Sequence, residues 1–561
     1  MLLTDEQKDV VAAFGNYDSI LVNALAGTGK TSTAIECINA HSNLRGIYLC
    51  FNRAIASEMN HRLHLLGIKN VSAQTIHSFA YNIVRGFLGD RPIDDGGAYE
   101  YIKTYTFQRN GGGEFSDRFD LARIRAIARE FISAWCHSAY TDFDAFLRGY
   151  DPKASYAQLR NLNVDIDHFH WRIKNFWQKL QADTSLPVAH DIYLKLFHLN
   201  FRQIVSQFGY DFVIADEAQD LFPLAEDVLK VFREEKTRLL CLGDRYQQIY
   251  SWNKSINTME RLEQDSLVLS LTQSFRCGDD VVETALPWLR LLGYTGRFLP
   301  RAGDAWPKYP AAALSRTVCG VFDILRQCTE NGLEMGEIYL VGGSSGYDFS
   351  IIQDYLHFSS GRRNRVKNRN MRQCADERAY DKLALSLMDR EMVKAKQICN
   401  RLGHDRTQAL LNAVKTGEFA DAGASPRMVV STGHKAKGME FGHVILENFS
   451  NFSEDYTAFT GKYLRPMLAS RIPSPDEIRR YELCSFASVQ SDGNPPPLYL
   501  DAEELRLNYV AVTRAIDSLN PCMLDLGRNG EYKKALSLIE EGKVVLTDRD
   551  MDGNMTLYKR H

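Results

Sequence analysis

The sequence predicts an α/β fold in which buried parallel strands end in loops that carry polar residues. Two stretches support this prediction. The short apolar run Ser19–Asn23 is followed by the glycine-rich loop Ala24–Thr31 and then by an amphipathic helical pattern. Much later in the chain, the apolar run Phe212–Ala215 ends directly in Asp216 and Glu217. Continuous apolar strands are typical of parallel sheets covered on both faces, and the functional residues of such sheets lie at the carboxyl ends of the strands.

The loop, written ALAGTGKT, differs from the phosphate-binding pattern G-x-x-x-x-G-K-[ST] only at Ala24. Gly27 and Gly29 permit a backbone that turns N–H groups toward phosphate oxygens, and a following helix adds the free N–H groups of its first turn. Lys30 is expected to reach the β- and γ-phosphates, and the Thr31 hydroxyl to bind Mg²⁺. A glycine-rich turn without a ligand is the alternative. The predicted phosphate site comprises Ala26, Gly27, Thr28, Gly29, Lys30, Thr31 and Ser32.

The acidic pair after the second strand has the complementary chemistry. Asp216 is expected to hold Mg²⁺, and Glu217 is expected to orient or deprotonate an attacking water. An acidic turn after a core strand is common on its own. Together with a phosphate loop, however, it predicts an α/β phosphate-loop domain that uses ATP and Mg²⁺.

Length and composition limit the remaining possibilities. The 561 residues correspond to roughly three or four domains. The net charge of -3 excludes a globally basic nucleic-acid binder, although a local basic groove is compatible with it. Eleven scattered cysteines without a C-x-x-C pair favour reduced thiols over disulfides, zinc or iron–sulfur sites. An acidic N-terminus and the lack of an apolar run of about 20 residues predict no signal peptide and no membrane span. We therefore expect a cytoplasmic protein, or a nuclear one in a eukaryotic cell.

Seven further stretches occur around these two in a fixed order: LTDEQKDVV (3–11), YLCFNRAIASEM (48–59), SAQTIHSFA (72–80), CLGDRYQQIYSW (241–252), LTQSFRC (271–277), STGHKAKGMEF (431–441) and EELRLNYVAVTRA (503–515). The whole series resembles the motif set of superfamily 1 DNA helicases of the UvrD/Rep/PcrA type, and its last two motifs also resemble those of the F-box DNA helicase branch. The resemblance implies two tandem RecA-like phosphate-loop NTPase domains with helical insertions. Alanine is common at the first loop position of UvrD-like helicases, so Ala24 agrees with the resemblance.

The resemblance implies a catalytic role for one arginine in each of two motifs. Arg276 in SFRC and Arg514 in VTRA are expected to stabilise charge on the transferring phosphoryl group. A guanidinium suits this role because it stays charged and binds oxygens through two N–H groups. Gln247 in GDRYQQ matches the glutamine that senses the γ-phosphate and couples it to DNA. With Lys30 and Glu217, these residues form the predicted catalytic set.

The resemblance also assigns residues to the base and sugar of the nucleotide. Gln7 matches the glutamine that reads the adenine edge. Phe275 matches an aromatic residue that stacks on adenine, with phenylalanine in place of the usual tyrosine. Glu440 in KGMEF matches an acid near the nucleotide sugar. Asp244 is equally compatible with supporting the end of its strand and with a functional role.

Single-stranded nucleic acid is held by phosphate contacts and by aromatic side chains beneath the bases. Trp252 and Tyr250 are the predicted stacking residues, and a position in the core is the alternative for them. Asn253-Lys254-Ser255 follow the tryptophan where bacterial relatives usually have Arg-Gly-Ala, which concerns base handling rather than the motor. The predicted DNA contacts, most of them implied by the resemblance, are Phe51, Asn52, Arg53, Thr75, His77, Tyr250, Trp252, Thr432, His434 and Lys435.

The motif positions imply two motor domains, each interrupted by an insertion: residues 1–84 and 201–276 with a helical insertion at 85–200, and residues 277–361 and 426–561 with a short insertion at 362–425. Within the short insertion, the run RRNRVKNRNMR (Arg362–Arg372) holds six basic residues and no acid. It is either a phosphate-contacting arm or a solvated charge run. Leu121–Trp135 and Phe169–Leu180 are predicted helices that pack within the first insertion, with DNA contact as the second possibility.

Together these features predict an ATP-driven DNA helicase that moves 3′ to 5′ along single-stranded DNA, as the UvrD-like group does, and unwinds duplexes at single-strand to double-strand junctions. The alternative is a DNA-gated ATPase switch, or a translocase that strips proteins without productive unwinding. The second insertion is considerably shorter than in UvrD-like enzymes, which keeps this alternative open. An RNA-directed motor fits the motif set less well, and no membrane partner is expected.

Overall fold

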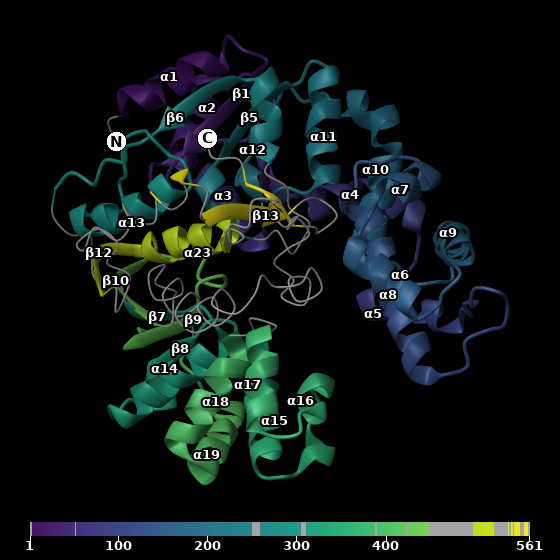
Figure 1. The fold of residues 1–561 in the computed structure, drawn as a ribbon. Helices are drawn as coiled ribbons and strands as arrows, with labels where there is room; N and C mark the ends of the chain where they lie inside the picture. The colour runs from purple at the N-terminus through teal and green to yellow at the C-terminus, as the bar shows by residue number, and fades with distance from the viewer. Residues whose placement is uncertain are drawn as a thin grey trace. The chain divides into compact units, whose positions relative to one another are not determined.

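The computed structural model describes residues 3–50, 52–249, 258–303, 310–386, 390–421, 425–447, 498–520, 537, 540–541, 544–549 and 555–558. The chain divides into two compact units (Figure 1). The first comprises Met1–Thr272 with Arg549–Thr556, and the second comprises Gln273–Asp548 with Leu557–His561.

The first unit is built on a six-stranded sheet with the order β3-β2-β4-β5-β1-β6, in which every described pairing is parallel. Its strands are β1 Ser19–Ala24, β2 Gly46–Cys50, β3 Val71–Thr75, β4 Phe212–Ala215, β5 Arg238–Gly243 and β6 Leu267–Leu271. The helices that precede or follow these strands are α1 Asp5–Phe14, α2 Lys30–Ala40, α3 Arg53–Leu65, α4 Ile76–Leu88, α11 Pro223–Glu234 and α12 Thr258–Leu262.

Both faces of this sheet are buried, as its apolar strands predict. Leu21, Ile47 and Val213 belong to one hydrophobic cluster, whereas their strand neighbours Val22 and Ile214 belong to another. Because successive side chains of a strand point to opposite faces, this division shows that the sheet separates two cores. The carboxyl ends of the strands are therefore the edge at which polar residues collect.

A helical segment, drawn in blue in Figure 1, separates β3 from β4. Leu121–Trp135 lies in α6 and Phe169–Leu180 lies in α9, so both helices form as predicted. Phe131, Trp135, Phe169 and Trp177 are buried, in agreement with a packing role, whereas Trp171 on α9 is 52% exposed. The helices of the segment are α5 Asp95–Glu100, α6 Arg118–His137, α7 Phe143–Gly149, α8 Lys153–Asn161, α9 Ile166–Ala182 and α10 His190–Ile204.

The second unit contains a five-stranded parallel sheet with the order β12-β10-β7-β9-β8. Its strands are β7 Ala311–Ser315, β8 Ile338–Leu340, β9 Met428–Thr432, β10 Phe441–Glu447 and β12 Ala515–Asn520. Its helices are α13 Asp279–Leu291, α14 Val318–Glu330, α15 Ser350–Ser359, α16 Arg369–Gln373, α17 Glu377–Ser386, α18 Arg390–Leu402, α19 His404–Thr416 and α23 Ala502–Val512. Near the end of the chain, β11 Leu498–Asp501 pairs with β13 Val544–Arg549, and β14 spans Met555–Leu557.

These two sheets confirm the predicted class, a mixed α/β fold consistent with two RecA-like domains that carry helical insertions. The nine cysteines in the described part of the chain are all free and buried, in agreement with reduced thiols. Within the described residues, every helix is too short or too polar to cross a bilayer.

Candidate functional site

The glycine-rich loop joins the carboxyl end of β1 to the first turn of α2. Gly27 and Gly29 have φ angles of 70° and 82°, which are left-handed values that favour glycine. Gly29 is the N-cap of α2, and no side chain caps the N-terminus of this helix. Thr28 fixes the turn because its hydroxyl donates to the Leu25 carbonyl over 2.8 Å. The local backbone therefore has the form that a phosphate cradle needs, with helix N–H groups at its base.

Asp216 is held at the carboxyl end of β4 with its side chain almost fully buried. One carboxylate oxygen accepts from the Tyr48 hydroxyl over 2.8 Å, and the other accepts from the Glu217 N–H over 2.9 Å. Burial and the charge of Glu217 raise the pKa of Asp216, whereas Lys30 and the Tyr48 bond oppose that shift. A divalent cation fits such a site, because it relieves the repulsion between two neighbouring carboxylates.

The glycine loop and the acidic strand end approach each other through two charged side chains. Lys30 Nζ lies 4.0 Å from Glu217 Oε1, and both groups remain partly exposed. Glu217 has a positive φ of 51°, which is uncommon for a residue with a side chain and typical of functional turns. The structure thus brings together three of the predicted chemical groups: the ammonium of Lys30, the carboxylate of Glu217 and the buried carboxylate of Asp216.

A hydrogen-bonded path runs from Glu217 to Gln247 through two further side chains. Gln219 Nε2 donates to Glu217 Oε2 over 2.6 Å, and Gln219 Oε1 accepts from the Asp244 N–H over 3.0 Å. Gln247 Nε2 donates to Asp244 Oδ2 over 2.7 Å. Gln219, Asp244 and Gln247 are buried, so the two bonds among them are shielded from water, whereas the bond to Glu217 is only partly buried. The path connects two motifs that are separate in the sequence.

Tyr48 and Gln219 are site residues that sequence reasoning missed. Tyr48 pairs with Ile214 of the neighbouring strand β4, which places its hydroxyl beside the end of that strand. Gln219 lies in the DEAQD stretch itself, and a buried amide two residues after the acidic pair was an available signal. The partner of each residue depends on strand order, which the sequence does not state.

Gln7 on α1 is buried, and its amide bonds to Thr4 before α1 and to Thr33 on α2. Its Oε1 accepts from the Thr4 N–H, and its Nε2 donates to the Thr33 hydroxyl, each over 3.0 Å. Gln7 and Thr4 form a capping box at the start of α1. This capping box engages the Gln7 amide that the resemblance assigned to the adenine edge.

In the second unit, Arg276, Glu440 and Arg514 form a separate cluster. Arg276 Nη2 forms an ion pair with Glu440, and the Arg276 Nε–H is buried without a partner among the described residues. Arg514 is buried, and its guanidinium donates to the carbonyls of Val510 and Met439. Phe275 is half-buried. Two predicted arginines and the predicted acid from three motifs are thus collected at one place.

The predicted DNA contacts that the structure describes in the first unit lie at or just after the ends of β2 and β3. Asn52 caps α3, because its Oδ1 accepts from the Ile55 N–H over 2.9 Å, and Arg53 is exposed. Thr75 is buried and caps α4 by accepting from the Ser78 N–H. His77 packs between the rings of Tyr193 and Phe222. Burial, reinforced by His137 and His190, lowers the pKa of His77 to about 4, so this imidazole is neutral at pH 7.

The predicted contacts of the second unit lie at the end of β9 and just after it. Thr432 is buried and accepts from the Lys435 N–H, whereas Lys435 is exposed. Lys435 Nζ donates to the Gly346 carbonyl over 2.5 Å and lies 4.1 Å from the centre of the Tyr347 ring. Burial lowers the pKa of His434 to about 4. Phe51, Tyr250 and Trp252 lie outside the described residues.

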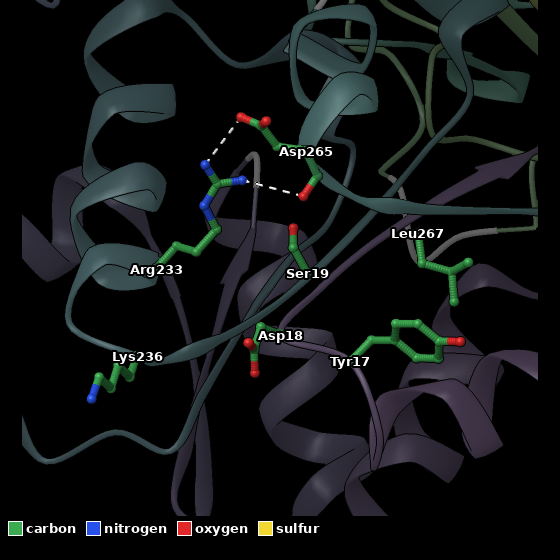
Figure 2. Close-up of a pocket in the computed structure, with 7 residues that line it drawn as sticks. All are labelled: Tyr17, Asp18, Ser19, Arg233, Lys236, Asp265 and Leu267. Atoms are coloured by element: carbon green, nitrogen blue, oxygen red, sulfur yellow. Dashed lines mark hydrogen bonds and ion pairs between the residues drawn. The ribbon is translucent and has the colours of Figure 1, made fainter.

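A separate pocket of about 640 Å³ lies where β1 and β6 begin (Figure 2). Arg233 crosses it and donates to the Asp265 carboxylate over 3.1 Å. None of the predicted site residues lines this pocket, which is at the end of β1 opposite to the glycine loop. This hollow therefore lies apart from the predicted phosphate site.

One protein family and several known helicases are similar to this chain. Residues 7–253 match the family described as an AAA domain. The chain is 24% identical to F-box DNA helicase 1 of Gallus gallus over 473 residues, covering 79% of this chain and 44% of that protein. It is 27% identical to F-box DNA helicase protein 1 of Schizosaccharomyces pombe over 311 residues, covering 52% and 33%. It is 23% identical to the ATP-dependent DNA helicase UvrD2 of Mycobacterium tuberculosis over 312 residues, covering 50% and 42%.

The chain thus spans less than half the length of these curated relatives. They nevertheless include both groups that the motif series resembles, and the matched AAA domain contains the glycine loop and the acidic strand end. The predicted resemblance is therefore confirmed: this chain is similar to superfamily 1 DNA helicases of the UvrD type and also resembles the F-box DNA helicases.

Proposed function

We propose that this chain is an ATP hydrolase and an ATP-dependent DNA helicase that moves 3′ to 5′ along single-stranded DNA and unwinds duplexes at junctions. The approach of Lys30 to Glu217, 4.0 Å between Nζ and Oε1, is the observation that carries the proposal. It puts a cation that can neutralise phosphate charge beside a carboxylate that can accept a proton from water. Hydrolysis of a nucleoside triphosphate uses both of these groups.

The residues around the glycine loop divide the chemical work. Thr31 and Asp216 would hold Mg²⁺, which when bound supplies positive charge against the phosphate oxygens. The N–H groups of the loop from Ala26 to Ser32 would cradle the phosphates, and Lys30 would neutralise the terminal ones. Glu217 would orient the attacking water and take its proton. Its carboxylate is already oriented by the bond from Gln219 Nε2.

Gln247 would report the state of the nucleotide to the DNA contacts. Its amide is tied to Glu217 through Asp244 and Gln219, so a movement at the γ-phosphate would reach it along rigid hydrogen bonds. From the second unit, Arg276 and Arg514 would stabilise the phosphoryl group that is transferred. We propose that Arg276 exchanges the Glu440 carboxylate for a phosphate oxygen, which leaves Glu440 free for the nucleotide sugar. Gln7 and Phe275 would contact the adenine.

The proposed function requires two motor domains. We propose that residues 1–84 and 201–276 form the first motor domain around the insertion 85–200, and that residues 277–361 and 426–561 form the second around 362–425. The compact units divide at Thr272 and Gln273, so Phe275 and Arg276 belong by contacts to the second unit. The ten predicted DNA contacts, Trp252 and Tyr250 among them, would hold the single strand.

A strand-displacement assay tests the helicase proposal. We expect the protein, with ATP and Mg²⁺, to release the labelled strand from a partial duplex that has a 3′ single-stranded tail and not from one with a 5′ tail. Release only from the 5′-tailed substrate would contradict the proposed direction. DNA-stimulated ATP hydrolysis without displacement of either substrate would refute the helicase and leave a DNA-gated switch or a protein-stripping translocase.

A further inference from the structure

The second insertion carries a dense group of positive charges on a short surface segment. We name residues 362–372, between α15 and the end of α16, the basic arm. Arg362, Arg363, Arg365, Lys367 and Arg372 of this arm are all exposed. None of the motor motifs includes these residues, so the proposed hydrolysis and translocation chemistry gives them no role.

The backbone of the basic arm is held in place from beneath. Val366 and Met371 are buried in the hydrophobic core of the second unit. The buried carboxylate of Asp354 on α15 accepts from the N–H of Lys367 over 2.9 Å and from the N–H of Asn368 over 2.7 Å. Asn368 in turn caps α16 by accepting from the Met371 N–H. A ligand of the basic arm would therefore meet cations on a fixed backbone, and less ordering entropy would oppose binding.

The acids on the two helices that flank the basic arm are already engaged. Asp354, the acid of α15, is occupied by the two arm amides. On α17, Glu377 and Asp381 both pair with Lys396. Asp376, just before α17, caps that helix through the Ala379 N–H. Within the described part of the chain, no carboxylate lies within ion-pair distance of the five exposed cations, so their charge faces outward.

Two side chains show the effect of these positive charges or limit where they lie: His357 and Arg363. Burial lowers the pKa of His357 on α15, and Arg365 and Arg362 lower it further, against an opposing effect of Asp354. Arg363 donates to the Ala375 carbonyl, and its guanidinium lies 5.5 Å from the centre of the Phe358 ring. Arg363 is thereby fixed against the surface, while Arg362, Arg365 and Lys367 project from the anchored backbone as exposed cations.

We propose that the basic arm binds the phosphate backbone of a nucleic-acid strand and anchors it to the second unit without reading its bases. The inference rests on the proposed function, because it names a further contact for the duplex part of the junction DNA on which that function acts. Arginine forks bind phosphate oxygens through paired N–H groups, which suits this composition. The arm contains no aromatic residue on which a base could stack, so its contacts are electrostatic and independent of sequence.

Salt-dependent binding without nucleotide tests the basic arm directly. The triple variant Arg362→Gln, Arg365→Gln, Lys367→Gln is compared with the parent on a fluorescent blunt duplex over a series of salt concentrations. Each lost phosphate contact lowers the slope of log affinity against log salt by about 0.9, so we expect a slope smaller by roughly 2 to 3. Binding at low salt should weaken by roughly tenfold or more.

A matched control separates this effect from general charge loss. Arg297, Arg406 and Lys415 are also exposed and lie in the second unit, outside the basic arm. The triple variant Arg297→Gln, Arg406→Gln, Lys415→Gln removes the same charge and should keep the parental slope. Both triple variants should retain the parental thermal midpoint and the parental ATP turnover with saturating single-stranded DNA, which shows that each is folded.

Three outcomes decide the inference. Equal slopes for the two triple variants would overturn it. Arm-dependent binding of poly-glutamate, with unchanged binding of DNA, would also overturn it and assign the surface to an acidic protein. A parent that binds the duplex through the basic arm but lacks DNA-stimulated ATP turnover would support the arm and refute the proposed motor function.

Discussion

Ala24 is the residue at which the glycine loop departs from the strict phosphate-binding pattern, and its surroundings explain why the loop keeps its form. It is the last residue of β1, it is 1% exposed, and it belongs to the core cluster that includes Val22 and Leu242. Its methyl group adds buried apolar surface at the loop entrance. The left-handed backbone is required only further on, at Gly27 and Gly29, where glycine is present.

Gly243, the last residue of β5, leaves room for Gln219, which belongs to the hydrogen-bonded path from Glu217 to Gln247. A Cβ atom at this position would lie 2.4 Å from Gln219 Oε1 and 2.5 Å from Met259 Sδ. We expect Gly243→Ala to displace Gln219, to lower the free energy of unfolding by about 1–3 kcal/mol and to reduce DNA-stimulated ATP turnover. Chemical denaturation and a steady-state ATPase assay measure the two effects.

Gly86→Ala is the matched control, because Gly86 lies within α4 and an added Cβ there meets no atom within 4 Å. Alanine at an unstrained helical position stabilises by about 0.5–1 kcal/mol. If the two glycine variants behave alike in both assays, the path through Gln219 does not depend on the close approach at Gly243.

At the scale of elements, α10 meets the segment after α6 around a buried amino group. Lys195 Nζ donates to the carbonyls of Ser138 and Tyr140 and lies 3.9 Å from the centre of the Trp135 ring. Burial lowers the pKa of Lys195 to about 7, against 10.5 for a free lysine. Between these values the unfolded chain binds a proton that the folded protein lacks. Stability therefore rises with pH in this window, by at most about 1.4 kcal/mol per pH unit.

Lys195→Met should remove this contribution. Urea unfolding of the parent and the variant across the window compares their free energies of unfolding at each pH. We expect the difference between parent and variant to move in favour of the parent as the pH rises, because other titrating groups cancel in the difference. Two parallel pH profiles would show that the buried amino group keeps its ordinary pKa.

A second element contact ties α23, which precedes Arg514, to β13. Arg506 on α23 is 1% exposed, pairs with Asp548 on β13 and lies 5.2 Å from the centre of the Tyr558 ring. Asp548→Asn would leave a buried guanidinium without its counter-charge, so we expect a loss of about 3 kcal/mol in the free energy of unfolding. Thermal unfolding measures the loss. Glu337→Gln, which removes the partly exposed charge that pairs with the exposed Arg427, is the control and should leave the melting temperature nearly unchanged.

At the scale of the whole molecule, the features that can be predicted are those that depend on residues close together in the sequence. The glycine loop, the acidic pair and the helices α6 and α9 each follow from a local pattern, so the sequence predicts them correctly. The contacts of Tyr48 with Asp216, and of Gln219 with Asp244, depend on β2 lying beside β4 and β4 beside β5. No local pattern states that order. The compact units divide at Thr272, and the domain boundary after residue 276, inside the SFRC motif, stays a prediction.

Hydrolysis of ATP in the presence of single-stranded DNA is the measurement that tests the central claim most directly. The parent is compared with Lys30→Ala, which removes the ammonium 4.0 Å from Glu217, and with Lys69→Ala, which removes an exposed lysine of the same unit. We predict DNA-stimulated turnover for the parent and Lys69→Ala, and a loss of about a hundredfold or more for Lys30→Ala, because the phosphates lose their closest cation. Parental turnover by Lys30→Ala would contradict the phosphate-loop assignment and the motor built on it.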